Sequence, residues 1–164
     1  MKVQLEQSFI YELNTRIFCI ENSCTLDTFP NKFFLSKEFQ ACDYLWLMGI
    51  WAPSPASKTI CDNHEGLLKE FQKALSDFSK KDIIGSPYAV YLYEPNHVVS
   101  GSFEEILRFK NKINSLGKKL ILDFVPNHMA VDTPLISEDS NYFLQGKDFD
   151  KCNHNFFLHQ TGAV

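Results

Sequence analysis

Residues 117–128 read GKKLILDFVPNH, and this short stretch says more about the architecture than any other part of the chain. Gly117 follows an amphipathic segment, residues 103–116, that predicts a helix, and a glycine is the usual stop for one. Residues 119–125 are almost entirely apolar and predict a buried strand. A helix, a glycine and a strand in succession form the second half of a βαβ unit, whose crossover is nearly always right-handed. The stretch therefore predicts a parallel α/β sheet.

Two other apolar runs, residues 16–20 and 44–48, predict further strands. All three runs are near-continuous rather than alternating, which is typical of parallel sheets covered on both faces. Helices are predicted over residues 31–41, 64–78 and 103–116, and Ser102 with Glu105 forms a capping-box pattern before the last one.

The connection from residue 50 to residue 101 is long and contains four of the seven prolines. Long connections after strands of α/β folds usually carry function. After Phe124 the sequence predicts loop up to Val164, with no further strand or strong helix.

Charge and composition exclude several classes of partner. The net charge is −4, and the basic residues form no block, which argues against a nucleic-acid or anionic-membrane partner. No apolar run approaches the ~18 residues of a membrane span. The odd number of cysteines and the absence of a C-x-x-C pattern favour reduced thiols in a cytoplasmic protein; the five are Cys19, Cys24, Cys42, Cys61 and Cys152.

Asp123, Asn127 and His128 bring an acid, an amide and an imidazole to the end of the predicted third strand. Burial of a carboxylate costs several kcal/mol unless it is paired or hydrogen-bonded. Ligands of parallel α/β folds bind at the carboxyl ends of strands, and these three groups could orient a polyol. Equally, Asp123 and Asn127 could satisfy local backbone groups of a capped loop. The residues themselves leave both readings open.

The pattern D-x-V-x-N-H, here residues 123–128, is similar to the first conserved region of the α-amylase family, glycoside hydrolase family 13. Three other stretches resemble this family in the same order. Residues 11–18 resemble its opening strand, residues 43–55 its second strand with the following loop, and residues 85–93 its G-Y-x-V-x-D-Y segment.

This resemblance implies a partial (β/α)8 TIM barrel. Residues 1–164 would be the N-terminal part of an incomplete catalytic domain, with three βα units and a long loop after the second strand. Residues 141–146 would begin an insertion after the third. A complete barrel needs about 250 residues, so three strands would leave an open edge. Self-association through that edge is therefore expected.

The resemblance also implies roles for individual side chains. By position, Tyr88 would stack on a sugar, His128 would hydrogen-bond the same sugar, and Asp123 would support the local geometry. Asn127 would help to hold calcium if the protein is calcium-dependent, and no other cofactor is expected. Trp51, just after the second predicted strand, is a further candidate for contact with an α-glucan or oligosaccharide. Departures from the pattern are Thr15, Ala89 and Leu92.

No catalytic residue is expected within this chain. In the family, the nucleophilic Asp, the acid/base Glu and a third Asp follow later strands, and their motifs do not occur after Val125. Retaining glycosidases need two carboxyl groups across the glycosidic bond. The acids that do occur there are expected to be solvated loop residues: Glu138, Asp139, Asp148 and Asp150.

The sequence thus predicts a truncated glycosidase of carbohydrate metabolism, inactive alone, whose family reaction is retaining hydrolysis or transfer of α-glucosidic bonds. Truncation, a frameshift or a split gene would each explain the pattern. One alternative is a non-catalytic carbohydrate-binding protein that uses Tyr88 and His128. Another is an unrelated doubly wound α/β domain that binds a phosphorylated ligand, although neither G-x-G-x-x-G nor G-x-x-x-x-G-K-[ST] is present.

Overall fold

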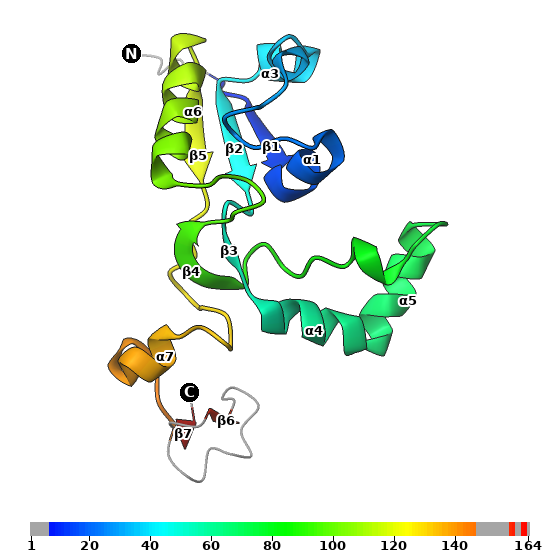
Figure 1. Ribbon diagram of the computed structural model, residues 1–164, viewed down its shortest axis with the longest axis vertical. Coiled ribbons are helices and arrows are strands. Elements are labelled where there is room, and N and C mark those ends of the chain that lie inside the picture. Colours follow the sequence, from blue (N-terminus) through cyan, green and yellow to red (C-terminus); the bar gives the residue numbers. More distant parts are fainter. Residues whose placement is uncertain (1–6, 147–157, 160–161, 164) are drawn as a thin grey trace, which may run out of the picture. The chain divides into compact units, whose positions relative to one another are not determined.

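The computed structural model describes residues 7–146, 158–159 and 162–163, and the chain divides into two compact units, residues 1–131 and residues 132–164 (Figure 1). The first unit contains a three-stranded parallel sheet with the order β1-β2-β5. Its strands are β1 (Ile10–Asn14), β2 (Tyr44–Met48) and β5 (Lys119–Leu122). The predicted parallel α/β sheet is confirmed, and the strands lie side by side in the order of the chain, without a reversal.

One face of this sheet is covered by helices. They are α1 (Thr15–Asn22), α2 (Asn31–Phe34), α3 (Lys37–Ala41) and α6 (Phe103–Ser115). Figure 1 shows α6 lying along β5. Leu45 and Leu47 of β2 are completely buried beneath a cluster of aromatic rings. Phe29 is central to this cluster, with ring centroids 4.6 Å from Phe18 and 5.1 Å from Phe109.

The opposite face of the sheet is open. Alternate residues point to it because side chains alternate along a strand, and Ile10 is 57% exposed there while Glu12 is also exposed. Trp46 and Ile121, which are neighbours in the register, are only half-buried. Continuous apolar runs predict a sheet covered on both faces, but within the described residues only one face is covered by helices.

The predicted strand at residues 16–20 is wrong, because these residues are helical. The strand lies earlier, at Ile10–Asn14, and α1 begins at the next residue. The side chain of Asn14 accepts a hydrogen bond of 3.3 Å from the backbone N–H of Ile17, which caps the helix. A short apolar run cannot be assigned to a strand or a helix by periodicity alone, and here the cap decides.

The predicted helix at residues 31–41 is two helices, α2 and α3. They are separated at Leu35 and Ser36, and the Ser36 hydroxyl accepts from the N–H of Phe39 to start α3. The predicted helix at residues 64–78 is shorter: α5 spans Glu65–Ala74 and ends where Leu75 becomes extended.

The helix predicted at residues 103–116 is confirmed as α6, together with its start and stop signals. The Ser102 hydroxyl accepts from the N–H of Glu105 at 3.3 Å. The Glu105 carboxylate accepts from the N–H of Gly101 at 2.8 Å instead of closing the box on Ser102. Gly117 has a φ of +76°, the left-handed conformation that suits glycine at a helix end.

The long connection after β2 is folded. It contains β3 (Trp51–Pro53), α4 (Pro55–Asn63), α5, the 3-10 helix η1 (Lys80–Asp82) and β4 (Val90–Pro95). Strands β3 and β4 form a two-stranded antiparallel sheet. Ser54 caps α4 by accepting from the N–H of Ser57 at 2.9 Å.

The second unit has short elements only among its described residues. They are α7 (Leu135–Glu138), the 3-10 helix η2 (Ser140–Tyr142), and the antiparallel strands β6 (Leu158–His159) and β7 (Gly162–Ala163). Glu138 is exposed, and Asp139 accepts from the N–H of Asn141 at 3.0 Å. Asp148, Asp150 and Cys152 lie outside the described residues.

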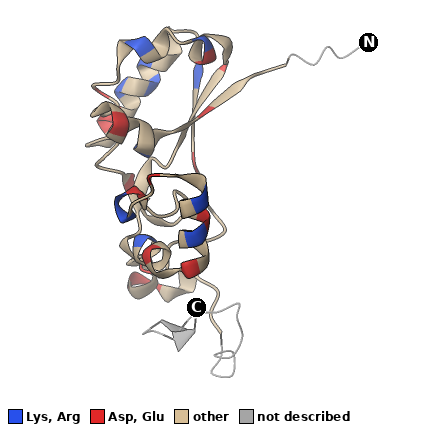
Figure 2. Ribbon diagram, turned by 90° about the vertical axis from the view of Figure 1, so that its right-hand side faces the viewer, with Lys and Arg blue, Asp and Glu red and all other residues tan. Residues whose placement is uncertain are grey.

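Acidic and basic residues are interspersed along the helices, and Figure 2 shows no helix that is uniformly basic. In the part of the chain that the structure describes, no helix is long and apolar enough to cross a bilayer.

The aromatic cluster generates a test of stability. Phe39 is fully buried, with its ring centroid 5.3 Å from that of Phe33 and 5.4 Å from that of Phe34. Phe39→Ala should lower the free energy of unfolding by about 3–5 kcal/mol, since it removes a buried ring and leaves a cavity. Leu35→Ala, at a site 79% exposed, is the control and should change little. Urea unfolding followed by circular dichroism measures both, and equal effects would contradict this core.

Candidate functional site

Asp123 directly follows β5, and its carboxylate is buried, with 6% of the residue exposed. One carboxylate oxygen accepts from Nε1 of Trp46 at 2.7 Å, and the other accepts from the backbone N–H of Gly49 at 2.7 Å. Hydrogen bonds to an ionised group are short and strong, so both oxygens are well compensated for the loss of water. The partners come from β2 and the turn after it, which distinguishes this arrangement from a locally capped loop.

The backbone around Asp123 is held by two aromatic side chains. The Asp123 carbonyl accepts from Nε1 of Trp51 at 2.7 Å. The Tyr93 hydroxyl accepts from the N–H of Val125 at 2.8 Å and donates to its carbonyl at 3.1 Å. Because Trp51 and Tyr93 also pack edge to face at 5.4 Å, they form one support beneath the end of the strand.

Trp51 therefore uses its polar atom on the backbone. Its ring contacts Tyr93 and, at 6.4 Å between centroids, Phe103, and the residue is half-buried. Only the exposed part of the Trp51 ring is available for contact with a sugar. The role of Trp51 in substrate binding stays a prediction.

Tyr88 lies beside Asp123. Both residues line a hollow of about 570 Å³ on the open face of the sheet, together with Trp46 and Ile121. Burial raises the pKa of the Tyr88 phenol, and the negative charges of Asp123 and Glu12 raise it further. The structure thus brings together two of the residues named from the sequence, one aromatic and one acidic.

His128 lies on another side of Tyr88. It lines a second hollow of about 210 Å³ with Tyr88 and residues of α4, including Ser57. His128 and Asn127 are exposed, and neither side chain makes a hydrogen bond to another described residue. Tyr88 lines both hollows and therefore connects the part of the candidate site at Asp123 with the part at His128.

Asn127 alone does not form a calcium site, because calcium takes six to eight oxygen ligands. Within residues 7–146, no three His, Cys, Asp or Glu side chains are grouped so that they could hold a metal ion. Amide and backbone carbonyl oxygens can also bind calcium, so a role of Asn127 in holding a calcium ion stays a prediction.

Glu12 is a site residue that the sequence did not suggest. Its carboxylate contributes to the field at Tyr88, and its register partner is Trp46. Alternation along residues 10–14, with Tyr11 and Leu13 toward the helices, is the signal that could have found it. The predicted strand at residues 16–20 does not include these residues, so Glu12 is not among the residues predicted for the site.

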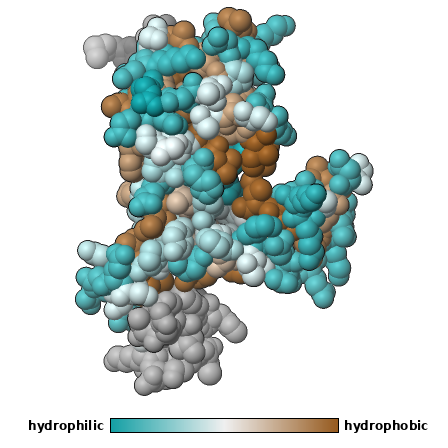
Figure 3. Space-filling model, viewed as in Figure 1, coloured by the Kyte–Doolittle hydropathy of each residue, from teal (hydrophilic) through white to brown (hydrophobic). Residues whose placement is uncertain are grey.

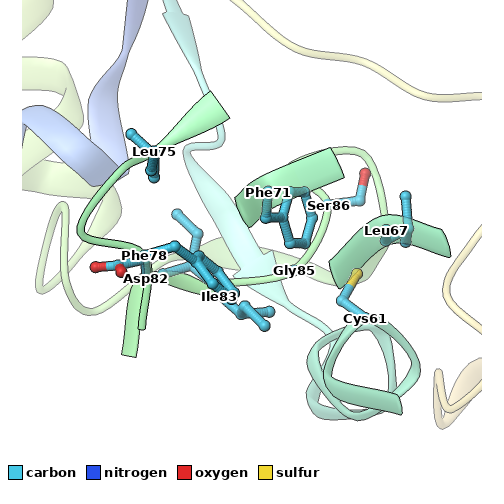
Figure 4. Close-up of a pocket in the computed structure, with 10 residues that line it drawn as sticks. Cys61, Leu67, Phe71, Leu75, Phe78, Asp82, Ile83, Gly85 and Ser86 are labelled. Carbon is cyan, nitrogen blue, oxygen red and sulfur yellow. The ribbon is translucent and has the colours of Figure 1, made fainter. Parts of the chain in front are cut away.

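A third hollow lies against the segment that leads to Tyr88, and it shares Cys61 and Ser86 with the hollow beside His128. It has a volume of about 340 Å³ and is lined mainly by apolar side chains of α5 and the segment after it, including Phe71, Phe78 and Ile83 (Figure 4). Figure 3 shows apolar surface in the recess beside α4 and α5. Gly85 also lines this hollow, so the segment before Tyr88 has an unfilled space on one side.

Among the described cysteines, Cys19 is the one whose thiol is most strongly affected by burial. Cys19, Cys24, Cys42 and Cys61 carry free thiols, and burial raises the pKa of the Cys19 thiol to about 12. A thiol with so high a pKa is almost entirely protonated at neutral pH and is therefore unreactive.

The fold is similar to that of a glycoside-processing enzyme of known structure. A crystal structure of an α-amylase from Lactobacillus plantarum matches with a TM-score of 0.60 and 20% sequence identity. The match covers 86% of this chain and 28% of that one, and at this identity it shows likeness of fold.

Among curated proteins, the chain is similar to Maltase A1 of Drosophila melanogaster, with 28% identity over 90 residues. This match covers 55% of the chain, and the matched part is 14% of the length of the maltase. No protein-family model matches the chain.

The two hydrogen bonds of Asp123 can be tested by Asp123→Asn. An amide has one acceptor oxygen, so either the Trp46 or the Gly49 N–H loses its partner in a buried place. We expect a loss of about 1–3 kcal/mol in the free energy of unfolding. Asp77→Asn, at an exposed site, is the control. Urea unfolding followed by tryptophan fluorescence gives both values; an unchanged midpoint for Asp123→Asn would disprove the anchoring role.

Proposed function

We propose that these residues form the N-terminal part of the catalytic domain of an α-amylase-type glycoside hydrolase, in glycoside hydrolase family 13. The observation that carries the proposal is the anchoring of Asp123 at the carboxyl end of the third parallel strand, beside Tyr88. Four sequence stretches that resemble this family in order support it, as do the partial likenesses to a maltase and an α-amylase.

A barrel would account for the face of the sheet that no helix covers among the described residues, because this face would be the inside of the barrel. In a (β/α)8 barrel the strands follow one another in chain order, helices cover the outside, and side chains of the inner face pack in layers. The order β1-β2-β5 and the one-sided cover by helices fit the first three units. The doubly wound alternative fits less well, since its strand order reverses at the ligand site.

The chemistry proposed for the site is recognition of an α-glucan or oligosaccharide. Tyr88 offers a ring for stacking on a pyranose, and His128 offers a nitrogen to its hydroxyl groups. Asp123 fixes the backbone at the carboxyl end of the sheet, because both of its carboxylate oxygens accept hydrogen bonds. Retaining hydrolysis or transfer needs two carboxyl groups placed across the bond, and we propose that the 164 residues alone do not catalyse it.

Calorimetry with maltotriose and a hydrolysis assay test this proposal. We expect weak binding without release of glucose. Tyr88→Ala should weaken binding roughly three- to tenfold, since an aromatic contact is worth about 0.5–1.5 kcal/mol. His128→Ala should weaken it as well. Tyr142→Ala and His97→Ala are matched controls at exposed positions and should bind like the parent chain.

Two results would count against the proposal. Turnover of maltotriose that His128→Ala abolishes would show that the chain is itself a glycosidase. Absence of heat at millimolar sugar would remove the carbohydrate site.

A non-catalytic carbohydrate-binding protein is the second candidate, because the two hollows that meet at Tyr88 form a surface without a catalytic pair. Tight stoichiometric binding by the 164 residues would favour this candidate, whereas weak binding favours a part of a catalytic domain. Self-association through the open sheet edge and a cytoplasmic location stay predictions; sedimentation over a range of concentrations tests the former.

A further inference from the structure

Arg16, in the first turn of α1, is a buried cation without an acidic partner among the described residues. Only 4% of the residue is exposed, and burial lowers the pKa of its guanidinium. An arginine stays charged in proteins, and buried charges are normally paired because burial without compensation is costly. The contacts that compensate Arg16 therefore have a structural purpose.

The guanidinium donates to two consecutive backbone carbonyls. Nη1 donates to the carbonyl of Ile84 at 3.2 Å, and Nη2 donates to that of Gly85 at 2.8 Å. Nε faces Gly49, where an added methyl group would lie 3.1 Å away, and Nε has no hydrogen-bond partner. The planar fork of arginine suits such a pair of acceptors, and the single ammonium of lysine cannot reproduce it.

Residues 84–88, which Arg16 contacts, are half-buried or exposed, and the nearest buried apolar side chain before them is Ile83. Helices α4 and α5 bury no residue, and the hollow of about 340 Å³ lies against Ile84 and Gly85 (Figure 4). Gly85 has a φ of +74°, a conformation that glycine adopts without strain, so its backbone keeps more conformational freedom than another residue would have. A further tie is exposed: the N–H of Ser86 donates to the Ser57 hydroxyl at 3.0 Å.

The same segment continues directly into Tyr88. The Ser86 hydroxyl accepts from the N–H of Tyr88 at 3.2 Å. An added methyl group on Gly49 would lie 3.3 Å from Cβ of Pro87, and the N–H of Gly49 is the one held by Asp123 at 2.7 Å. Arg16 and Pro87 thus leave no room for a side chain at Gly49, whose N–H donates to the carboxylate of the site.

We propose that Arg16 is a positioning residue that fixes residues 84–88 against the turn after β2, and so keeps Tyr88 beside Asp123. We call the two hydrogen bonds from the Arg16 guanidinium to the carbonyls of Ile84 and Gly85 the tether. Its importance for carbohydrate recognition rests on the proposed function.

Arg16→Met and Arg16→Lys test the tether. Met has a similar length without donors, whereas Lys keeps the charge and loses the fork. Arg108→Met is the matched control, because Arg108 is the other arginine of the chain, lies at the surface and pairs with Asp27. Two NMR measurements are made on each protein: amide hydrogen exchange of residues 84–88, and the titration of tyrosine carbons, with Tyr88 assigned by Tyr88→Phe.

In Arg16→Met, exchange of the 84–88 amides should accelerate about tenfold or more, since a segment with no fully buried residue opens easily once its tie is removed. The pKa of Tyr88 should fall toward the ordinary value for tyrosine, because the ring moves away from the carboxylates and into water. Arg16→Lys should lie between Arg16→Met and the parent chain. Unchanged exchange and titration in both variants, equal to those of Arg108→Met, would overturn the proposal.

Measurement on the unaltered chain decides the matter if the Arg16 variants do not fold. Nitrogen-15 NMR of the guanidinium groups should give separate, slowly exchanging Nη signals for Arg16 and averaged signals for Arg108. Averaged signals from both would refute the tether. Calorimetry with maltotriose distinguishes this from the proposed function: a held segment with no heat on sugar addition rejects the function and leaves the tether standing.

Discussion

The hydrogen bonds of the Asp123 carboxylate are the constraint on which the candidate site depends. The buried Asp123 carboxylate is compensated by an indole N–H and a backbone N–H, each of which donates to one of its oxygens at 2.7 Å. These bonds fasten the end of β5 to Trp46 and to the turn at Gly49. The Arg16 side chain lies next to that turn, and its guanidinium donates to the carbonyls of Ile84 and Gly85 in the segment before Tyr88. One charged group thus organises three separate parts of the chain.

The parallel sheet could be predicted from the sequence where local signals agree with the tertiary structure. The strand at residues 44–48 and the helix that leads to Gly117 are such cases, since capping, periodicity and the glycine all point the same way. The prediction of the first strand at residues 16–20 is wrong, because a short apolar run fits a strand and a buried helix equally well. The antiparallel pair of β3 and β4 is not predicted from the sequence, because 36 residues separate the two strands and neither strand shows a clear alternation.

The candidate site could be predicted only in part, and the reason is the distance along the chain over which its contacts act. Tyr88 and Asp123 were named through resemblance to a family, and they lie beside one hollow. Arg16 contacts Gly85 across 69 positions, and Tyr93 contacts Val125 across 32. No local pattern marks such residues, because their roles arise from folding. Glu12 is different, since correct placement of the first strand would have revealed it.

The join between β1 and α1 has a consequence for how such a scaffold could diversify. Strand and helix share the boundary between Asn14 and Thr15, with no connecting loop. An insertion there would separate the cap from its helix and shift Arg16 out of reach of its carbonyls. Insertions are therefore easier to accommodate in the much longer connection between β2 and α6, where added length leaves the sheet register undisturbed. Variation in loop length is therefore expected in the connection after β2, whereas the junction of β1 and α1 keeps a fixed length.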